Sequence, residues 1–188
     1  MEDLIKSSRI NTTTSELMNY YTSAEEAKKI ILNCSLVAAG ACAVGSTIPV
    51  LAIPAIIVGC FGAVWVMYGK ICNKLGISIR ENALKLLARA ALTNISTNLI
   101  SVFAIELLST FIPGIGTVTG SLVSFATVYL AGVMFMELIL GMAKKNISFD
   151  NVNENELKRA MKNIEVSADD VKDVKNVYAE SKASDNNA

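Results

Sequence analysis

The sequence predicts an all-α membrane protein built from two helical hairpins, about four apolar helices, and a short C-terminal helical tail. Three observations predict this class: 52% of the 188 residues are hydrophobic, only 18% are charged, and the charges lie mostly at the two ends. Residues 1–29 contain nine charged residues and residues 144–188 contain seventeen, whereas residues 30–143 contain eight. Because an ordinary soluble domain has about 25% charged residues, this distribution favours membrane insertion.

Four parts are expected along the chain. They are a polar N-terminal segment over 1–22, a helical membrane domain over 23–145 with hairpins at 23–75 and 78–143, a cytoplasmic helical tail over 146–182, and a disordered end over 183–188. The first segment carries acids at Glu2 and Asp3 and no apolar run, so it is not expected to be a cleavable signal peptide.

The first hairpin is predicted from an uncharged stretch over 30–69. A single span needs about 20 residues, so this stretch is long enough for two. Ser23 followed by Glu26 has the spacing of a capping box and predicts a helix over 23–44. Pro49 and Pro54 form the predicted tip, and the second helix is expected from Pro54 to Leu75.

A basic connector and the second hairpin follow. The connector carries five cations against the single acid Glu81: Lys70, Lys74, Arg80, Lys85 and Arg89. Ser78 and Glu81 form a second capping box, which predicts a helix from 78 to about 110. The second tip contains Pro113, Gly114 and Gly116, which interrupt helices, and a fourth helix is expected over 117–143.

The positions of the cations predict the topology. Neither tip carries a charge, so the positive-inside rule predicts that both termini and the connector face the cytoplasm. The hairpins either cross the bilayer or only dip into it, and the sequence leaves both alternatives open. Residues 48–65 also align weakly with residues 112–129 at an offset of 64, which is consistent with either an internal duplication or a shared apolar composition.

Small residues are frequent in three of the four apolar helices. They allow helix backbones to approach closely in lipid, so a compact bundle or a homo-oligomer is expected. They are Ala38, Ala39, Gly40, Ala41, Ala43, Gly59, Gly62, Ala63, Gly120, Ala126, Ala131 and Gly132.

A polar seam is predicted in the third helix. Asn94, Asn98 and Ser101 fall on one face at helical spacing, and Glu106 is an ionisable residue in the apolar region. Such a residue is costly in lipid and is a candidate functional site. The seam either lines an ion or proton path or supplies hydrogen bonds between helices, and we favour the second interpretation.

The chain shows no pattern typical of an enzyme. It has no His, which removes the commonest general base and metal ligand. The four cysteines, Cys34, Cys42, Cys60 and Cys72, lack C-x-x-C spacing and are interpreted as packing residues. Gly114 and Gly116 are followed by no Lys of a phosphate-binding loop. We therefore expect no catalytic residue, no metal and no cofactor. The net charge of zero gives no indication of a nucleic-acid partner.

The tail is predicted to contain two amphipathic helices. Asn153 and Glu156 precede an apolar stripe formed by Leu157, Ala160, Met161 and Ile164. Ser167 and Asp170 precede a second stripe formed by Val171, Val174, Val177 and Tyr178. Such a pair of helices is expected either to fold against the connector or to bind a partner helix.

Residues 49–140 resemble bacterial domain-of-unknown-function family 697, a helical membrane domain often associated with Era-like small GTPases. The likeness rests on Pro49 and Pro54 before an apolar helix, on Met67-Tyr68-Gly69, on the segment 83–87, and on the segment 112–116. The family usually has an acidic residue after its first proline pair, and this chain has none there. The resemblance implies a location in the bacterial inner membrane and a GTPase as a separate partner.

We therefore expect a non-enzymatic integral membrane protein that contacts lipid and acts as an anchor or adaptor for a cytoplasmic partner such as a small GTPase. The alternative is a pore, a channel, or a membrane-acting toxin or immunity protein. A more distant alternative is a soluble helical bundle with a very apolar core.

Overall fold

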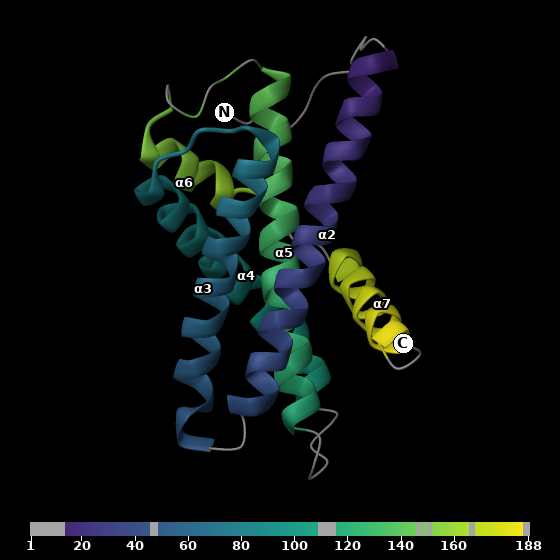
Figure 1. The fold of residues 1–188 in the computed structure, drawn as a ribbon. Helices are drawn as coiled ribbons and strands as arrows, with labels where there is room; N and C mark the ends of the chain where they lie inside the picture. The colour runs from purple at the N-terminus through teal and green to yellow at the C-terminus, as the bar shows by residue number, and fades with distance from the viewer. Residues whose placement is uncertain are drawn as a thin grey trace.

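A computed structural model describes residues 14–45, 49–108, 116–145, 147, 149, 152–165 and 168–185. Over these ranges the chain forms six helices and no strand (Figure 1). The long helices are α2 (Thr14–Gly45), α3 (Pro49–Leu75), α4 (Glu81–Leu108) and α5 (Gly116–Lys144), and the shorter ones are α6 (Glu154–Lys162) and α7 (Ala168–Asp185). The all-α class is thus confirmed, and four long helices are followed by two shorter ones in the tail.

Several helix ends differ from the prediction. α2 begins at Thr14 and passes through Ser23, so the capping box predicted there is wrong and the polar segment over 1–22 is helical from Thr14. Residues 14–23 contain no Pro or Gly that would interrupt the helix. α3 begins at Pro49, because proline suits a first helical position, where no N–H is needed, and Pro54 lies within the helix.

Two further ends also differ. α4 begins at Glu81, three residues after Ser78, and α7 continues to Asp185, into the part predicted to be disordered. The last residues of α7 are mostly Ala, Glu, Ser and Lys, none of which ends a helix. Ser167, the predicted cap of α7, lies outside the described residues.

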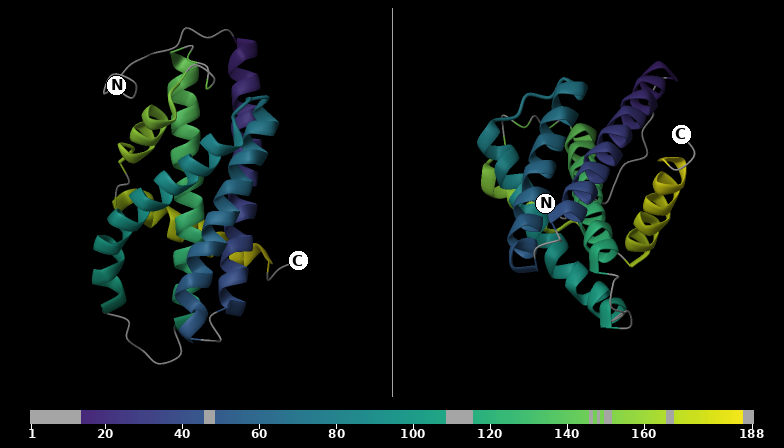
Figure 2. Two further views of the ribbon diagram at one scale, coloured as in Figure 1. Left: turned by 90° about the vertical axis from the view of Figure 1, so that its left-hand side faces the viewer. Right: turned by 60° about the horizontal axis from the view of Figure 1, so that its bottom comes forward.

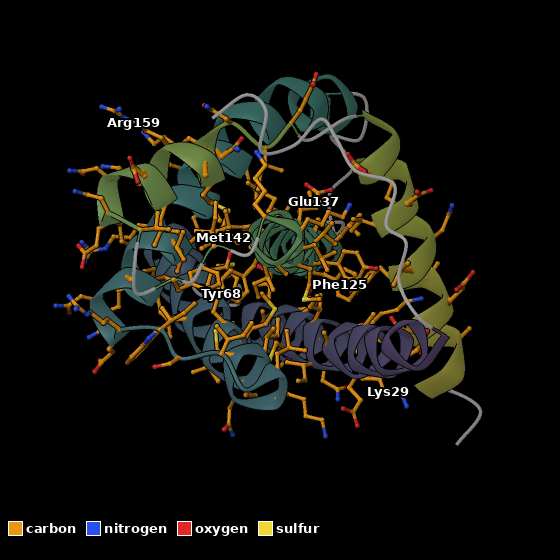
Figure 3. The ribbon with its side chains drawn as sticks, turned by 90° about the horizontal axis from the view of Figure 1, so that it is seen from above. Lys29, Tyr68, Phe125, Glu137, Met142 and Arg159 are labelled. Atoms are coloured by element: carbon orange, nitrogen blue, oxygen red, sulfur yellow. The ribbon has the colours of Figure 1, made fainter. Side chains whose placement is uncertain are left out.

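α5 is the central helix of the bundle. It contacts α2, α3, α4, α6 and α7. Viewed from above, α5 lies in the middle, with α6 and α7 on opposite sides (Figure 3). Its fully or nearly fully buried side chains include Phe125, Val128, Met134 and Phe135. This long apolar helix is thus largely enclosed by other helices of the chain.

Two adjacent positions on α5 hold α3 and α2. The Tyr68 hydroxyl of α3 donates to the Ala131 carbonyl at 2.9 Å, and its ring stacks on Phe135 with centroids 3.9 Å apart. A Cβ on Gly132 would lie 2.7 Å from Cγ1 of Ile31, so α2 approaches α5 only because Gly132 has no side chain. The close approach predicted for small residues is therefore present at Gly132. A Cβ on Gly40, Gly59 or Gly62 would meet nothing within 4 Å.

The two hairpins pack differently. α3 and α5 run in the same direction, and the Tyr68–Ala131 hydrogen bond joins residues 63 apart, close to the offset of 64 in the sequence alignment. α2 lies along α5, whereas α4 runs obliquely and packs mainly against α6 (Figure 2). An internal duplication stays a prediction. The helices of the second hairpin, α4 and α5, contact each other less than α2 and α3 do.

We predict that Gly132→Ala lowers the free energy of unfolding by about 1–3 kcal/mol, because its Cβ would overlap the branched end of Ile31. Chemical denaturation of the purified protein measures this change. Gly40→Ala is the matched control, since its Cβ enters open space and alanine favours a helix by up to about 1 kcal/mol. Equal effects at the two glycines would contradict the close-packing explanation.

Candidate functional site

Two cations of α4 lie over two aromatic rings of α3. Lys85 Nζ is 4.8 Å from the centroid of the Trp65 ring, and Arg89 Cζ is 5.7 Å from the centroid of Phe61. Lys85 and Arg89 are four residues apart on α4, and Phe61 and Trp65 are four residues apart on α3. This spacing places the two cations on one face of α4 and the two rings on one face of α3. We call these four residues the cation–aromatic row.

The other connector cations lie at the same end of the bundle, beyond the row. Lys70 and Arg80 are exposed, and Lys74 pairs with Glu26 of α2 at 3.0 Å. Lys85 also pairs with Glu81 at 2.6 Å within α4. Exposed ion pairs of this kind contribute about 0–1 kcal/mol, so they orient the side chains more than they stabilise the fold. The predicted connector cations thus lie around the junction of α3 and α4, at one end of the bundle.

The row lies at a defined distance from the hairpin tips. Phe61 is twelve residues beyond Pro49, which is about 18 Å along α3 at 1.5 Å per residue. The Tyr68–Ala131 register places Phe61 level with Ser124 of α5, about 12–14 Å from Gly116. On the tip side of this level the described exposed residues of α2, α3 and α4 are uncharged: Gly40 and Ala41 on α2, Gly59 on α3, and Thr93 and Ser96 on α4. The tail helices carry exposed charges here, at Glu180 beyond Tyr178 and at Lys162, whose carbonyl accepts from Asn94.

Helix α7 reaches the same level on the opposite side of the bundle. The Tyr178 ring contacts Phe125, with centroids 4.8 Å apart, and Val174 is buried beside it. Nearer the other end of α5, the negative charge of Asp170 is close enough to Glu137 to raise its pKa. Both Glu137 and Phe125 lie on the side of α5 that faces α7 (Figure 3). α7 therefore covers α5 from Glu137 down to Phe125.

Asn94 attaches α6 to α4. Its side-chain amide donates to the carbonyls of Met161, Lys162 and Ile164 at 3.1, 3.1 and 2.9 Å. The last carbonyls of a helix have no partner within the helix, so Asn94 satisfies acceptors that would otherwise be buried and unpaired. The predicted seam residue Asn94 thus forms a packing hydrogen bond, and its partner is the tail rather than another apolar helix.

The predicted tail helix is present where α6 lies. Asn153 is its N-cap and accepts from the backbone N–H of Asn155 at 2.8 Å. Leu157, Met161 and Ile164 are buried, so the apolar stripe faces the bundle. Of the two alternatives for the tail, α6 folds against α4, the helix that carries the connector residues Lys85 and Arg89, whereas α7 packs on α5.

The other predicted site residues are described only in part. Asn98, Ser101 and Glu106 lie within α4, but their side chains are outside the described residues. Pro113 and Gly114 also lie outside them, and Gly116 begins α5.

Buried cysteines behave as the packing interpretation predicts. Cys34, Cys60 and Cys72 are buried, and the side chain of Cys42 is outside the described residues. Burial raises the pKa of Cys72 to about 12 and also raises the pKa of Cys34. Both thiols are therefore protonated near neutral pH and are poor nucleophiles. Within the described ranges, no group of three Cys, Asp or Glu residues is placed to hold a metal ion.

One helix of the described residues, Gly120–Lys144, is long and apolar enough to cross a membrane by length and composition. Sixty-one per cent of its most apolar window is buried inside the bundle, and a core helix of a soluble protein passes the same test. The described residues therefore define a helical bundle around a buried apolar helix. No protein-family model, curated protein or solved structure matches the chain.

We predict that Asn94→Ala detaches α6, because two buried carbonyls and one partly buried carbonyl lose their donor at a cost of about 1–3 kcal/mol. Hydrogen exchange measures this as faster exchange at residues 154–164, with α2 and α3 unchanged. Asn82→Ala, at an exposed position of the same helix, is the control. Unchanged exchange in α6 would show that its apolar stripe alone holds it.

We predict a pH effect at Glu137, whose pKa is raised by partial desolvation and then by the nearby Asp170. The folded protein holds this proton more tightly than the unfolded chain, so stability falls as the pH rises through the raised pKa. Glu137→Gln removes this loss, and its melting temperature should exceed that of the wild type increasingly toward neutral pH. Glu165→Gln, at an exposed position, is the control. A wild-type pH profile in Glu137→Gln would contradict the prediction.

Proposed function

We propose that this protein is a non-enzymatic membrane anchor whose two hairpin tips enter one leaflet of a bilayer while the charged end of the bundle stays in water. One observation carries the proposal: charged residues reach the same level on two sides of the bundle. The cation–aromatic row marks this level on α3 and α4, and α7 marks it on α5. Beyond it, α3 extends about 18 Å to Pro49 and α5 about 12–14 Å to Gly116, and the oblique α4 extends about 28 Å along its own axis to Leu108.

The length of the tips favours dipping over crossing. The hydrocarbon core of a bilayer is about 30 Å thick, so one leaflet accounts for about 15 Å. Crossing would carry Arg89 and the charged residues Asp173 and Lys175 of α7 into hydrocarbon, at a cost of at least several kcal/mol. Entering one leaflet desolvates a single ionisable residue of α4, Glu106, at a cost of about 3 kcal/mol.

The charged end is the proposed adaptor surface. α6 buries its apolar stripe and keeps Glu154, Arg159 and Lys162 exposed, and Arg159 projects from the rim of the bundle in Figure 3. This polar face is suited to a protein partner in the cytoplasm, where the positive-inside rule directs the connector and both termini. The resemblance to family 697 makes a small GTPase the proposed partner and the bacterial inner membrane the proposed location.

The enclosed α5 favours a second candidate function. A bundle that surrounds a helix of spanning length, Gly120–Lys144, is able to release it into a bilayer if α7 and α6 detach. The protein would then be a pore-forming, toxin-type or immunity-type protein. Ion flux across vesicles that contain the purified protein distinguishes this candidate from an anchor, which conducts nothing.

We predict the depth of each part from tryptophan quenching by brominated lipids. Trp65 is the single tryptophan and lies one turn above Phe61, so bromines near the headgroups should quench it more than bromines near the mid-plane. In the variant Trp65→Phe with Thr117→Trp, the new tryptophan at the start of α5 should show the opposite order.

The two alternatives give different patterns in the same experiment. Crossing hairpins carry position 117 to the far interface, where shallow bromines quench it and deep ones do not. A soluble bundle shows no quenching at either position and does not float with vesicles. Either pattern would overturn insertion into one leaflet.

A further inference from the structure

We infer that the cation–aromatic row binds the headgroups of anionic phospholipids. The inference rests on the proposed insertion of the tips, because insertion brings the row to the membrane surface. It adds a lipid preference that insertion by itself does not require.

The row holds its cations in a defined position. Lys85 and Arg89 project from successive turns of α4, and each lies over a ring of α3. A ring under a cation contributes about 0.5–1 kcal/mol at an exposed site and limits the freedom of the side chain. Tryptophan is itself enriched at the interface between membrane and water, which fits the place of Trp65 beside Lys85.

The positive charge of the cation–aromatic row favours an anionic headgroup. Glu81 pairs with Lys85, but no carboxylate among the described residues is ion-paired with Arg89. A guanidinium binds two phosphate oxygens at once, so Arg89 is suited to a phosphodiester. Lys70 and Arg80 add exposed positive charge above the row. An anionic headgroup therefore gains attraction here that a zwitterionic headgroup does not.

Distance from the tips places the row at headgroup height. Arg89 lies level with Phe61, about 18 Å from Pro49, just outside the roughly 15 Å of hydrocarbon in one leaflet. The Glu26–Lys74 ion pair places Lys28 and Lys29 level with the last turns of α3, about 15 Å further from the tips. These two exposed cations of α2 supply a control of equal charge at the wrong height.

The test measures binding of the full-length protein to vesicles by flotation. Vesicles of phosphatidylcholine alone are compared with vesicles in which about 30% is replaced by phosphatidylglycerol, a typical anionic lipid. The wild type should prefer the anionic vesicles. Lys85→Gln with Arg89→Gln should lose about 30-fold of this preference, at about 1 kcal/mol for each cation. Lys28→Gln with Lys29→Gln should keep most of it.

Two further arms separate the row from folding and from free phosphate. Lys85→Arg with Arg89→Lys keeps both charges and should keep the preference, and circular dichroism checks that each variant is folded. Inorganic phosphate and glycerol phosphate, titrated by calorimetry without vesicles, should give no binding. Saturable binding of either would overturn the inference in favour of a site for a soluble phosphate.

The outcomes distinguish the inference from the function on which it rests. No flotation with either vesicle overturns the membrane anchor itself. Flotation that is equal on both vesicles, or equal losses in the two double variants, leaves the anchor standing and overturns the headgroup site. Only a loss specific to the row supports it.

Discussion

The contact between α2 and α5 at Ile31 and Gly132 is the constraint on which the bundle depends. A helix that meets a neighbour across a glycine lies closer to it than side chains usually allow, and here this holds α2 directly against the central helix. The next residue of α5, Ala131, accepts the hydrogen bond from Tyr68, and Phe135 stacks on the same ring one turn away. Three positions on one helix thus determine where both helices of the first hairpin lie.

The helices that surround α5 limit how much of it can contact lipid. An apolar helix such as Gly120–Lys144 is poorly soluble when exposed, and neighbouring helices bury 61% of its most apolar window (Figure 3). Part of the shield is α7, which is short and rich in charged residues, and it ends its contact with α5 near Phe125. The same tail that covers the apolar helix therefore limits how far that helix can enter lipid.

Asn94 shows how a polar residue in an apolar helix acquires its role from a partner. An amide at this position in a bilayer would need a donor or acceptor from another membrane helix. In the bundle it instead satisfies three carbonyls at the end of α6, and in doing so it links the tail to the second hairpin. The second hairpin differs from the first in that its oblique α4 packs mainly against α6.

By itself, the sequence determined the all-α class, the order of the helices and the Asn153 cap, because helix formation and capping depend on residues within a few positions of one another. It missed the start of α2 at Thr14, since Ser23 has the local spacing of a cap whether or not the helix continues through it. Only the tertiary structure decided that Asn94 meets residues 67–70 positions away, and that Arg89 lies over Phe61. The tertiary structure alone also decided that Phe61 of α3 and Phe125 of α5 lie at about the same height along the bundle. Such contacts depend on how whole helices pack, and no local pattern of residues specifies that.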